Sequence, residues 1–398
     1  MNNARGVAEK NLNSANHKIQ KKFILVGHVT ESYGAVQALS EYLKNMNAFF
    51  VLISHPFSCS ELLNSSCLLF ENKTLIKELR FPSYKTPQFI RFFQDFFFTL
   101  YFFLRLGDKY DVFFGFDCLN AFSGIMLRKF RLVKKFVFYE CDYTPERFRS
   151  KILDFVYHWL NGFAARHADM VWNNPPNMEE IRERQGSSKE KNIRVPHGVD
   201  LASVSLPRKI YREVLVYAGH VTEPHGLQLL VKSMPKIVSE CPNVKVWIIG
   251  SGPYERTLRE SIEHENLSSY FKFYGYTNHC LTYQLLSMCG VGLAPYVNED
   301  KGTFRFCEPL KVKDYLACGL PIIITKVPAC AYEIEEKRLG IAINYDPDEF
   351  SAAALKLLTD DEFYYACKNN VLSISANLTW KHIYDQAFEK SDLEAKLC

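Results

Sequence analysis

The chain has 398 residues, of which 47% are hydrophobic and 23% charged, and its formal net charge is +4. This composition excludes intrinsic disorder, collagen-like repeats and coiled coil over most of the length, and the length suggests two or three domains. So mild a positive charge gives no reason to expect nucleic acid as a partner. The twelve Cys form no CxxC pattern, which excludes the short-spaced zinc and thioredoxin signatures and is typical of a reducing cytosol.

Strand and helix patterns alternate through the first half. Residues 1–21 are polar and lack an apolar core, so we expect a flexible lead and no signal peptide. A buried-strand pattern then ends at Gly27, a loop runs to Gly34, and an amphipathic helix and a second strand follow. Further strands are expected at 111–116, 135–139 and 169–173. This alternation predicts a parallel sheet with helices on both faces.

The segment 89–106 contains eight Phe in 18 residues, but charged residues interrupt it, so we reject a membrane-spanning helix. Two alternatives stay open: a core helix, or a helix that docks on lipid. The core alternative places one set of Phe on a single buried face, namely Phe89, Phe92, Phe93, Phe96 and Phe103. The basic run from Arg128 to Lys135 would suit an anionic membrane surface or a lipid diphosphate, or else a solvated loop.

The pattern restarts after residue 200. A polar linker is expected at 201–212, and a buried strand then ends at Gly219. The loop from Gly219 to Gly226 matches the loop from Gly27 to Gly34 at six of eight positions. Four more strands, expected at 244–250, 271–275, 291–295 and 321–325, alternate with helices. The sequence therefore predicts two similarly built α/β domains that face one another.

Four patterns of the second half occur in the order seen in family 4 glycosyltransferases. They are the loop 219–226, WIIGSGP at 247–253, FYGYT at 273–277 and EPLKVKDYLACGLP at 308–321. The chain thus resembles that family. The resemblance implies a GT-B fold: two facing Rossmann-like, doubly wound domains with a cleft between them. It further implies an acceptor-binding domain at 22–200, a donor-binding domain at 213–379, and a C-terminal helix at 380–398 that returns to the first domain.

Such an enzyme must hold a nucleotide diphosphate, a sugar and an acceptor hydroxyl. Glycine turns and basic side chains bind phosphate, and a carboxylate accepts hydrogen bonds from ribose hydroxyls. The resemblance therefore implies that the donor is met by Gly219, Gly226, Gly250, Tyr276 and Asp314, with Asp314 at the ribose in place of the family's glutamate.

The chain departs from the family at the residues that bind the diphosphate. The family's Arg and Lys are replaced by His220 and His225, which can serve only when protonated. If they do serve, donor affinity should fall as pH rises from about 6 to 8.

The family's first acidic residue falls on Phe306. We therefore assign the sugar or terminal phosphate to Glu308, and the cationic role to Arg305 and Lys311 of a Pro-x-Lys variant. The alternatives are that Glu308 is a solvated surface acid and that Lys311 forms a salt bridge with Asp314 along one helix.

Polar residues also follow two strands of the first half. Asp142 is the expected catalytic acid there, with Arg147 as its partner, or else a turn residue. Because loops after parallel strands face the ligand crevice, we expect Gly27, His28 and Gly34 on the acceptor side, with the segment 117–120 as a weaker candidate.

The sequence thus predicts a retaining hexosyltransferase with a nucleotide-sugar as substrate and a glycan or lipid-linked acceptor. We expect no cofactor and no metal, since Asp346 is better placed to cap a helix than to bind a cation. The expected location is cytoplasmic, with peripheral contact at the inner face of an anionic membrane. The alternatives are a non-catalytic nucleotide-sugar-binding relative, a GT-B-like epimerase and a phosphorylase.

Overall fold

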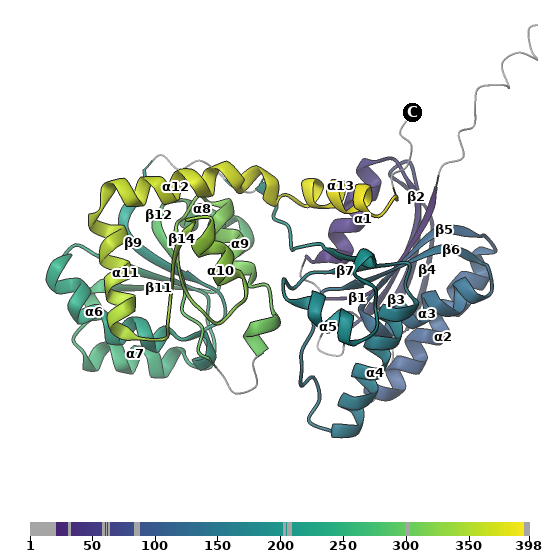
Figure 1. Ribbon diagram of the computed structural model, residues 1–398, viewed down its shortest axis with the longest axis horizontal. Coiled ribbons are helices and arrows are strands. Elements are labelled where there is room, and N and C mark those ends of the chain that lie inside the picture. Colours follow the sequence, from purple (N-terminus) through teal and green to yellow (C-terminus); the bar gives the residue numbers. More distant parts are fainter. Residues whose placement is uncertain are drawn as a thin grey trace, which may run out of the picture. The chain divides into compact units, whose positions relative to one another are not determined.

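The structure is a computed structural model, and it describes residues 21–30, 33–57, 60, 62, 64–82, 88–201, 204, 209–298 and 303–393. Residues 1–20 of the predicted lead and half of the predicted linker, 202–203 and 205–208, lie outside these ranges. The chain divides into two compact units (Figure 1). The first comprises Met1–Tyr139, Phe163–Val171 and Phe388–Cys398, and the second comprises Glu140–Gly162 and Trp172–Ala387.

The first sheet has eight strands in the order β4-β3-β2-β1-β5-β6-β7-β8. Its parallel pairs include β1 with β2, β1 with β5, and β5 with β6. After β1 the chain adds β2 on one side, and later β5 on the other. The carboxyl ends of β1 and β5 therefore flank the switch point at which open α/β sheets bind ligands. The bounds are β1 (Lys22–Val29), β2 (Phe49–Pro56), β5 (Tyr110–Phe116), β6 (Val133–Glu140), β7 (Met170–Asn173) and β8 (Asn192–Arg194).

Two strands at the edge of the first sheet were not predicted from the sequence. β3 (Asn64–Glu71) pairs antiparallel with β2, and β4 (Thr74–Pro82) pairs antiparallel with β3, so the sheet is mixed. Asn72 and Lys73 join them with positive φ angles of 49° and 72°, as a tight hairpin turn requires. Because β4 is largely exposed, its sequence lacks the apolar run of a buried strand.

Five helices and part of a sixth accompany the first sheet along the chain. They are α1 (Ala35–Asn45), α2 (Gln88–Leu106), α3 (Asp117–Lys129), α4 (Lys151–His167), α5 (Met178–Arg184) and the end of α13 (Trp380–Lys390). Near the end of α13, the ring of Phe388 packs against Phe23, Tyr42 and Phe114. The chain's last helix therefore completes the core of the first unit.

The Phe-rich helix α2 buries a different face from the one predicted. Its buried positions recur every three or four residues and are largely polar: Arg91, Asp95, Thr99 and Phe102, with Phe103 beside the last. By contrast, Phe93 is 66% exposed, so the prediction of a single Phe core face is wrong. Phe103 is buried as expected, Phe92 and Phe96 are half-buried, and the side chain of Phe89 lies outside the described residues.

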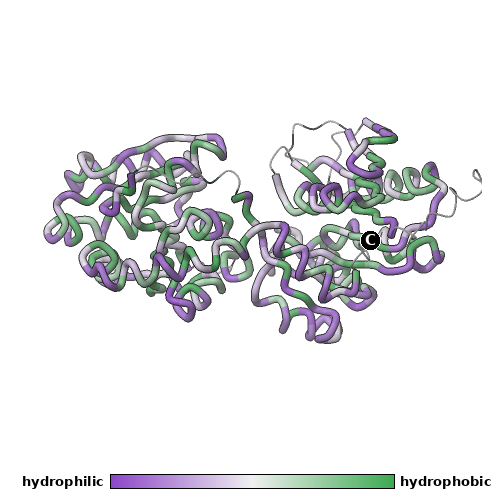
Figure 2. Tube along the Cα trace, turned by 90° about the horizontal axis from the view of Figure 1, so that it is seen from above, coloured by the Kyte–Doolittle hydropathy of each residue, from purple (hydrophilic) through white to green (hydrophobic). Residues whose placement is uncertain are grey.

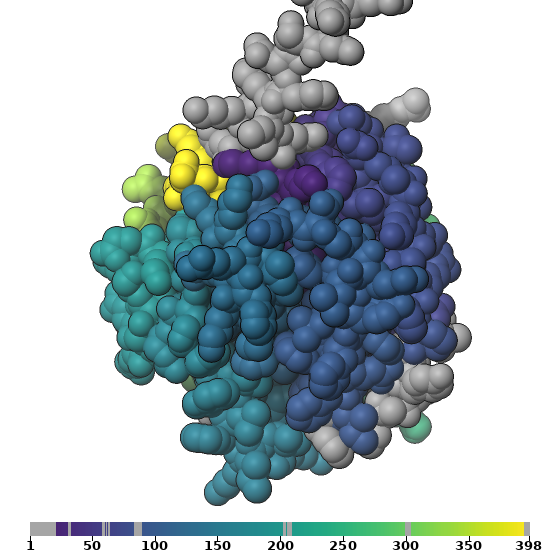
Figure 3. Space-filling model, turned by 90° about the vertical axis from the view of Figure 1, so that its right-hand side faces the viewer, coloured from purple at the N-terminus to yellow at the C-terminus, as the bar shows by residue number. Residues whose placement is uncertain are grey.

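The exposed face of α2 is apolar. It consists of Ile90, Phe93, Phe97, Tyr101 and Leu104, which follow helical spacing. Residues of this part of the chain, blue in Figure 3, form much of the surface seen there. In the described parts of the chain, we find no helix that combines the length and apolarity required to cross a bilayer.

The second sheet has six strands in the order β11-β10-β9-β12-β13-β14, and every pairing within it is parallel. Together with the first sheet it confirms the predicted fold class, two Rossmann-like α/β units. Hydrophobic stretches, green in Figure 2, alternate with hydrophilic ones along both units. The strands are β9 (Tyr211–Ala218), β10 (Lys245–Ile249), β11 (Phe271–Gly275), β12 (Cys289–Ala294), β13 (Ile322–Thr325) and β14 (Gly340–Ile343).

The helices of the second sheet include two that the sequence did not predict, α10 (Cys330–Glu336) and α12 (Asp361–Ser375). The short α5 before β8 of the first sheet was likewise not predicted. The cap predicted at Asp346 is confirmed, since its Oδ1 accepts the N–H groups of Asp348 and Glu349 at 3.0 and 2.9 Å. The remaining helices are α6 (Leu227–Glu240), α7 (Glu255–His264), α8 (His279–Ser287), α9 (Leu310–Ala317) and α11 (Pro347–Thr359).

Candidate functional site

Two glycines bring the ends of β9 and β10 together. The N–H of Gly219 donates to the carbonyl of Ile249 at 2.9 Å. Gly219 and Gly250 have φ angles of +139° and +122°, which other residues rarely adopt. A Cβ on Gly250 would lie only 2.0 Å from the carbonyl oxygen of Gly219. Only glycine therefore fits at Gly250, and this edge of the sheet exposes backbone to an approaching ligand.

Lys311, in the first turn of α9, lies against the same edge. A Cβ on Gly219 would lie 3.2 Å from Lys311 Nζ, which confirms that these two predicted residues meet. The ammonium donates to the hydroxyl of Tyr217 at 2.8 Å and lies 4.0 Å from the centre of that ring. Among the described residues, no carboxylate lies within ion-pair distance of it.

Burial decides the charge of Lys311. It lowers the pKa of this side chain to about 7, and only the nearby Cys307 opposes the shift. A lysine whose ammonium is desolvated without a counter-charge is costly to keep, unless an anion binds there. The site thus has the electrostatic character of an anion-binding site.

The two histidines that replace the family's cations differ in environment. His220 is exposed, and its ring lies beside Gly252, where a Cβ would be 2.6 Å from its Cδ2. His225 is half-buried, and its Nδ1 is 2.6 Å from the hydroxyl of Thr222. Burial, with Lys311 and His220 nearby, lowers the pKa of His225 to about 3. His225 is therefore neutral between pH 6 and 8, which contradicts its predicted cationic role.

Three other residues predicted to bind the nucleotide-sugar lie at different places in the second unit. Gly226 has a φ of +76° and begins α6, and a Cβ there would lie 1.6 Å from the carbonyl oxygen of Pro295. Tyr276 follows β11 and is 86% exposed. Asp314 accepts a hydrogen bond from the hydroxyl of Tyr283 at 2.8 Å, and burial raises its pKa. Their donor contacts stay predictions.

Both carboxylate oxygens of Glu308 contact other groups of the protein. Its side chain is only 1% exposed, and Oε1 lies 2.7 Å from Lys313 Nζ and 3.6 Å from Arg194 Nη2. Its Oε2 accepts the N–H of His197 at 2.7 Å. The predicted contact of Glu308 with a sugar stays a prediction, which would require this network to open.

The remaining predicted acid and cations lie near the surface. Arg305, in the short helix Thr303–Phe306, is exposed, and its guanidinium carbon lies 5.9 Å from the ring centre of Phe306. Asp142 has a side chain that is 71% exposed. The expected pairing with Arg147 is confirmed at 3.5 Å, and the same guanidinium donates to the carbonyl of Asp142 at 3.1 Å.

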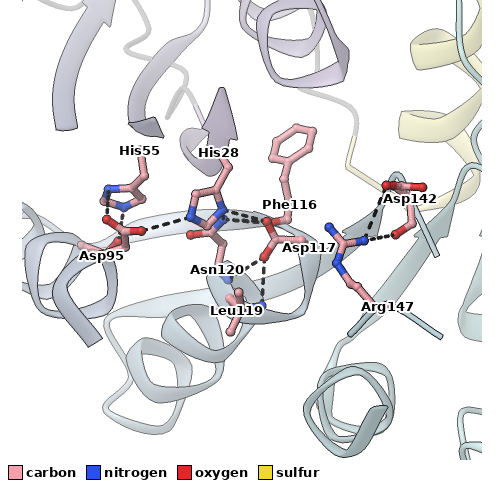
Figure 4. Close-up of polar contacts among 10 residues, drawn as sticks. His28, His55, Asp95, Phe116, Asp117, Leu119, Asn120, Asp142 and Arg147 are labelled. Carbon is pink, nitrogen blue, oxygen red and sulfur yellow. Dashed lines mark hydrogen bonds and ion pairs between the residues drawn. The ribbon is translucent and has the colours of Figure 1, made fainter. Parts of the chain in front are cut away.

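The first unit holds a cluster of four ionisable side chains around the end of β1 (Figure 4). His28 lies between two carboxylates, with Nδ1 2.9 Å from Asp117 Oδ2 and Nε2 3.1 Å from Asp95 Oδ2. Burial opposes protonation, but the two carboxylates prevail and raise the pKa of His28 to about 9. The predicted acceptor-side histidine is therefore an imidazolium whose two nitrogens are both occupied.

Neighbouring strands and α2 complete this cluster. His55, at the end of β2, has its ring nitrogens 3.0 Å from Ser65 Oγ and 2.9 Å from Thr99 Oγ1. Burial lowers the pKa of His55 to about 4, so it is neutral. His55 and Asp95 were not predicted from the sequence; the available signal was the polar spacing of Arg91, Asp95 and Thr99 within a Phe-rich helix.

The two glycines of the first loop have structural roles. A Cβ on Gly27 would lie 2.6 Å from Cγ2 of Val36, so the glycine lets β1 and α1 approach closely. Gly34 precedes α1, and its N–H donates to the side chain of Gln37 at 3.1 Å. Over the described ranges, no group of three or more His, Cys, Asp or Glu side chains is arranged to hold a metal ion.

Comparison with known proteins locates a family domain in the second unit. Residues 212–360 match the model of the family described as glycosyl transferases group 1. A phosphatidyl-myo-inositol mannosyltransferase of Mycolicibacterium smegmatis is 24% identical over 179 residues, which is 43% of this chain and 44% of that protein. The match thus spans less than half the length of this relative.

Solved structures resemble the whole chain at low sequence identity. Sucrose-phosphate synthase from Thermosynechococcus elongatus superposes with a TM-score of 0.69 at 16% identity, covering 93% of this chain and 98% of that one. Alr3699/HepE of Anabaena, solved in complex with UDP, gives 0.67 at 14% identity, covering 94% and 99%. At these identities the likeness shows the fold alone.

Proposed function

We propose that this chain, a group 1 glycosyltransferase of GT-B fold, transfers a hexose from a nucleotide-sugar to an acceptor hydroxyl. The observation that carries the proposal is Lys311, a buried lysine without a counter-charge beside the glycine edge of β9 and β10. A nucleoside diphosphate would supply the missing negative charge.

The roles follow from where charge develops in the reaction. When the bond between the sugar and the diphosphate breaks, its electron pair goes to the departing diphosphate, where Lys311 stabilises the new charge. The acceptor oxygen attacks the anomeric carbon to form the new glycosidic bond, and its proton goes to the departing diphosphate oxygen. In this proposal Asp314 holds the ribose, and Arg305 and His220, which are both exposed, contact the diphosphate. Retention of anomeric configuration and independence from metal are what the family resemblance implies.

Nucleotide-bound neighbours support the choice of donor. The Anabaena protein Alr3699/HepE has been solved with UDP and with UDP-glucose, and the catalytic domain of starch synthase IV from Arabidopsis thaliana with ADP and acarbose. The base is therefore best found with a panel of UDP, GDP and ADP and their sugars. Thermal shift identifies the ligand, and release of nucleoside diphosphate with an acceptor demonstrates transfer.

Lys311→Met should weaken binding of the selected nucleoside diphosphate by about 1.5–3 kcal/mol, the loss expected when a charge-assisted contact is removed. Titration calorimetry at pH 6.5 measures the loss. Lys236→Met is the matched control, because Lys236 is an exposed lysine of the same unit that pairs with Asp348. Equal affinities of wild type and Lys311→Met would place the diphosphate elsewhere.

We propose a lipid-linked acceptor and peripheral contact with an anionic membrane at its cytoplasmic face. The supporting observation is the exposed apolar face of α2, with Phe93 and Phe97 near its middle. The basic run contributes less than predicted, because Arg128, Lys134 and Lys135 already pair with Asp169, Asp111 and Asp392. The mycobacterial relative, by its name, mannosylates a phosphatidylinositol, which is an acceptor of this kind.

A double change of Phe93→Asp and Phe97→Asp should weaken binding to vesicles of phosphatidylglycerol and phosphatidylcholine by about 2 kcal/mol or more, since two largely exposed rings would lose their burial in lipid. Vesicle co-sedimentation at low salt measures it. The control is Tyr365→Asp with Leu372→Asp, two exposed apolar residues of α12. Wild-type protein that ignores these vesicles would instead favour a glycan acceptor in solution.

A second candidate function is favoured by His225, whose neutral side chain stands where the family carries a cation. It is a nucleotide-sugar-binding protein without transferase activity. Nucleotide binding with no release of nucleoside diphosphate, from any donor that binds and across glycan and lipid acceptors, would select this candidate over the enzyme.

A further inference from the structure

The cluster around His28 lies at the switch point of the first sheet. His28 ends β1, and Asp117 follows the last residue of β5, on the two sides of the place where the strand order reverses. Open α/β sheets bind ligands at this edge. The cluster therefore combines a favourable place for a ligand with an unusual concentration of charge.

Asp117 has a strained backbone and an accessible carboxylate. Its φ is +64°, a conformation that costs free energy for a residue with a side chain and is concentrated at functional sites. The side chain is 31% exposed, whereas those of His28 and Asp95 are 7% and 4% exposed. Asp117 is thus the member of the chain Asp95–His28–Asp117 that a ligand can reach.

The buried members fix this carboxylate. His28 contacts Asp117 Oδ2, while the N–H groups of Leu119 and Asn120 donate to Oδ1 at 2.9 and 3.2 Å. Together they lower the pKa of Asp117 against the effect of burial, so the group stays ionised. The amide of Asn120 reaches Oδ2 only at 3.2 Å, which makes it the contact that a ligand hydroxyl would replace most readily.

The cost of the network indicates that it does more than stabilise the fold. Burying the carboxylate of Asp95 and the imidazolium of His28 is expensive, and apolar packing commonly does better. Asp95 Oδ1 is buried without a hydrogen-bond donor among the described residues, and His55 Nδ1 lies 3.5 Å from it. Such unsatisfied charge is expected where a site holds a side chain in one orientation for a ligand.

An exposed aromatic ring lies beside the cluster. Phe57, which follows β2, is 39% exposed, and its ring centre lies 5.3 Å from that of His28. Its N–H donates to the carbonyl of Val29 at 3.1 Å, which ties it to the end of β1. A carboxylate that accepts hydroxyl groups, next to an aromatic face that covers C–H groups, is suited to a sugar or cyclitol ring.

We propose that Asp117 and Phe57 bind the acceptor as a polyol, with Asp117 accepting a hydroxyl and Phe57 covering the ring, while His28 and Asp95 position Asp117. This inference rests on the proposed transferase function, because it assigns the acceptor to the first unit. It specifies a ring with free hydroxyls, such as a sugar or an inositol, as the group recognised, irrespective of any lipid attached to it.

The test measures ligand binding and does not depend on turnover. Myo-inositol and the methyl glycosides of mannose, glucose and galactose are offered to the full chain in saturation-transfer NMR, and the best ligand is titrated. Asp117→Asn should weaken its affinity at least about tenfold, a loss typical of a charge-assisted contact, and Phe57→Ala severalfold. Asn tolerates positive φ and caps helices, so the Asn variant keeps the fold, which a thermal melt verifies.

Asp108→Asn is the control, because Asp108 is an exposed carboxylate of the same unit that pairs with Lys22. His28→Gln tests the positioning role and should weaken polyol binding while leaving nucleoside diphosphate affinity unchanged. The inference is overturned if the wild type binds none of these polyols, or if Asp117→Asn and Asp108→Asn bind them alike. Polyol binding that depends on Asp117, in a protein that binds no nucleotide, would contradict the transferase function and leave a polyol site at Asp117 that is not an acceptor site.

Discussion

Arg182→Met should lower the free energy of unfolding by about 3–5 kcal/mol, the cost of removing one partner from a buried ion pair. Arg182 and Glu140 have side chains that are 0% and 2% exposed, and their Nη2 and Oε2 atoms lie 3.4 Å apart. Asn161 also donates to this carboxylate, and the guanidinium donates to Asn173 Oδ1 at 2.8 Å. Methionine fills the space but leaves the Glu140 carboxylate buried without its counter-charge.

Chemical denaturation, followed by the fluorescence of the tryptophans, measures this loss. Arg184→Met is the control on the same helix, since Arg184 is exposed and its one ion pair within the described residues is with the exposed Glu180. Combining Arg182→Met with Glu140→Gln should restore part of the stability, because the stranded charge is then removed. A loss no greater than that of Arg184→Met would mean that the pair contributes nothing beyond its desolvation cost.

The two matching loops illustrate what sequence can and cannot predict. Both follow the first strand of a Rossmann-like unit, as the repeat of Gly27 to Gly34 in Gly219 to Gly226 predicted. Their histidines nevertheless have opposite environments: His28 is buried between two carboxylates, while His220 is exposed. The difference arises because Asp95 and Asp117, from α2 and the start of α3, meet His28 across 67 and 89 residues of chain.

The prediction of the buried face of α2 was wrong for a related reason. Periodicity placed its Phe residues in the core, on the assumption that apolar residues are buried. The structure instead buries Asp95 and Thr99, because His28 and His55 provide their hydrogen-bond partners. Local sequence carries no record of those partners. Lys311, by contrast, was predictable, since the motif and the glycine edge fixed its place independently of distant side chains.

The charge on Lys311 should cost stability, and its removal should therefore stabilise the protein. The pKa of Lys311 is about 7 in the fold against 10.5 for an ordinary lysine, so the unfolded chain binds more protons between these values. The penalty is complete below about pH 7 and disappears as pH rises toward 10.5. Lys311→Met keeps the aliphatic stem and should gain about 2–4 kcal/mol at pH 6.5, after loss of the Tyr217 hydrogen bond.

Melting curves at pH 6.5 and pH 10 check this sign, since the advantage of Lys311→Met should shrink at the higher pH. A variant less stable than wild type at pH 6.5 would show that the ammonium is already compensated within the protein. A lysine retained at such a cost is expected where its charge serves a ligand.

The protonation of Lys311 should also control the affinity for the nucleoside diphosphate. Below about pH 7 Lys311 is already protonated, so affinity for the nucleoside diphosphate stays constant with respect to this group. A bound diphosphate raises the pKa of the Lys311 ammonium, so binding above pH 7 takes up a proton. The affinity therefore falls by about tenfold per pH unit, until the pH reaches the pKa of Lys311 in the complex. Calorimetry from pH 6.5 to 9 should show this fall in the wild type and a weak, flat profile in Lys311→Met. Because His225 is neutral throughout this range, a fall that persists in Lys311→Met would show that a group other than Lys311 controls donor affinity.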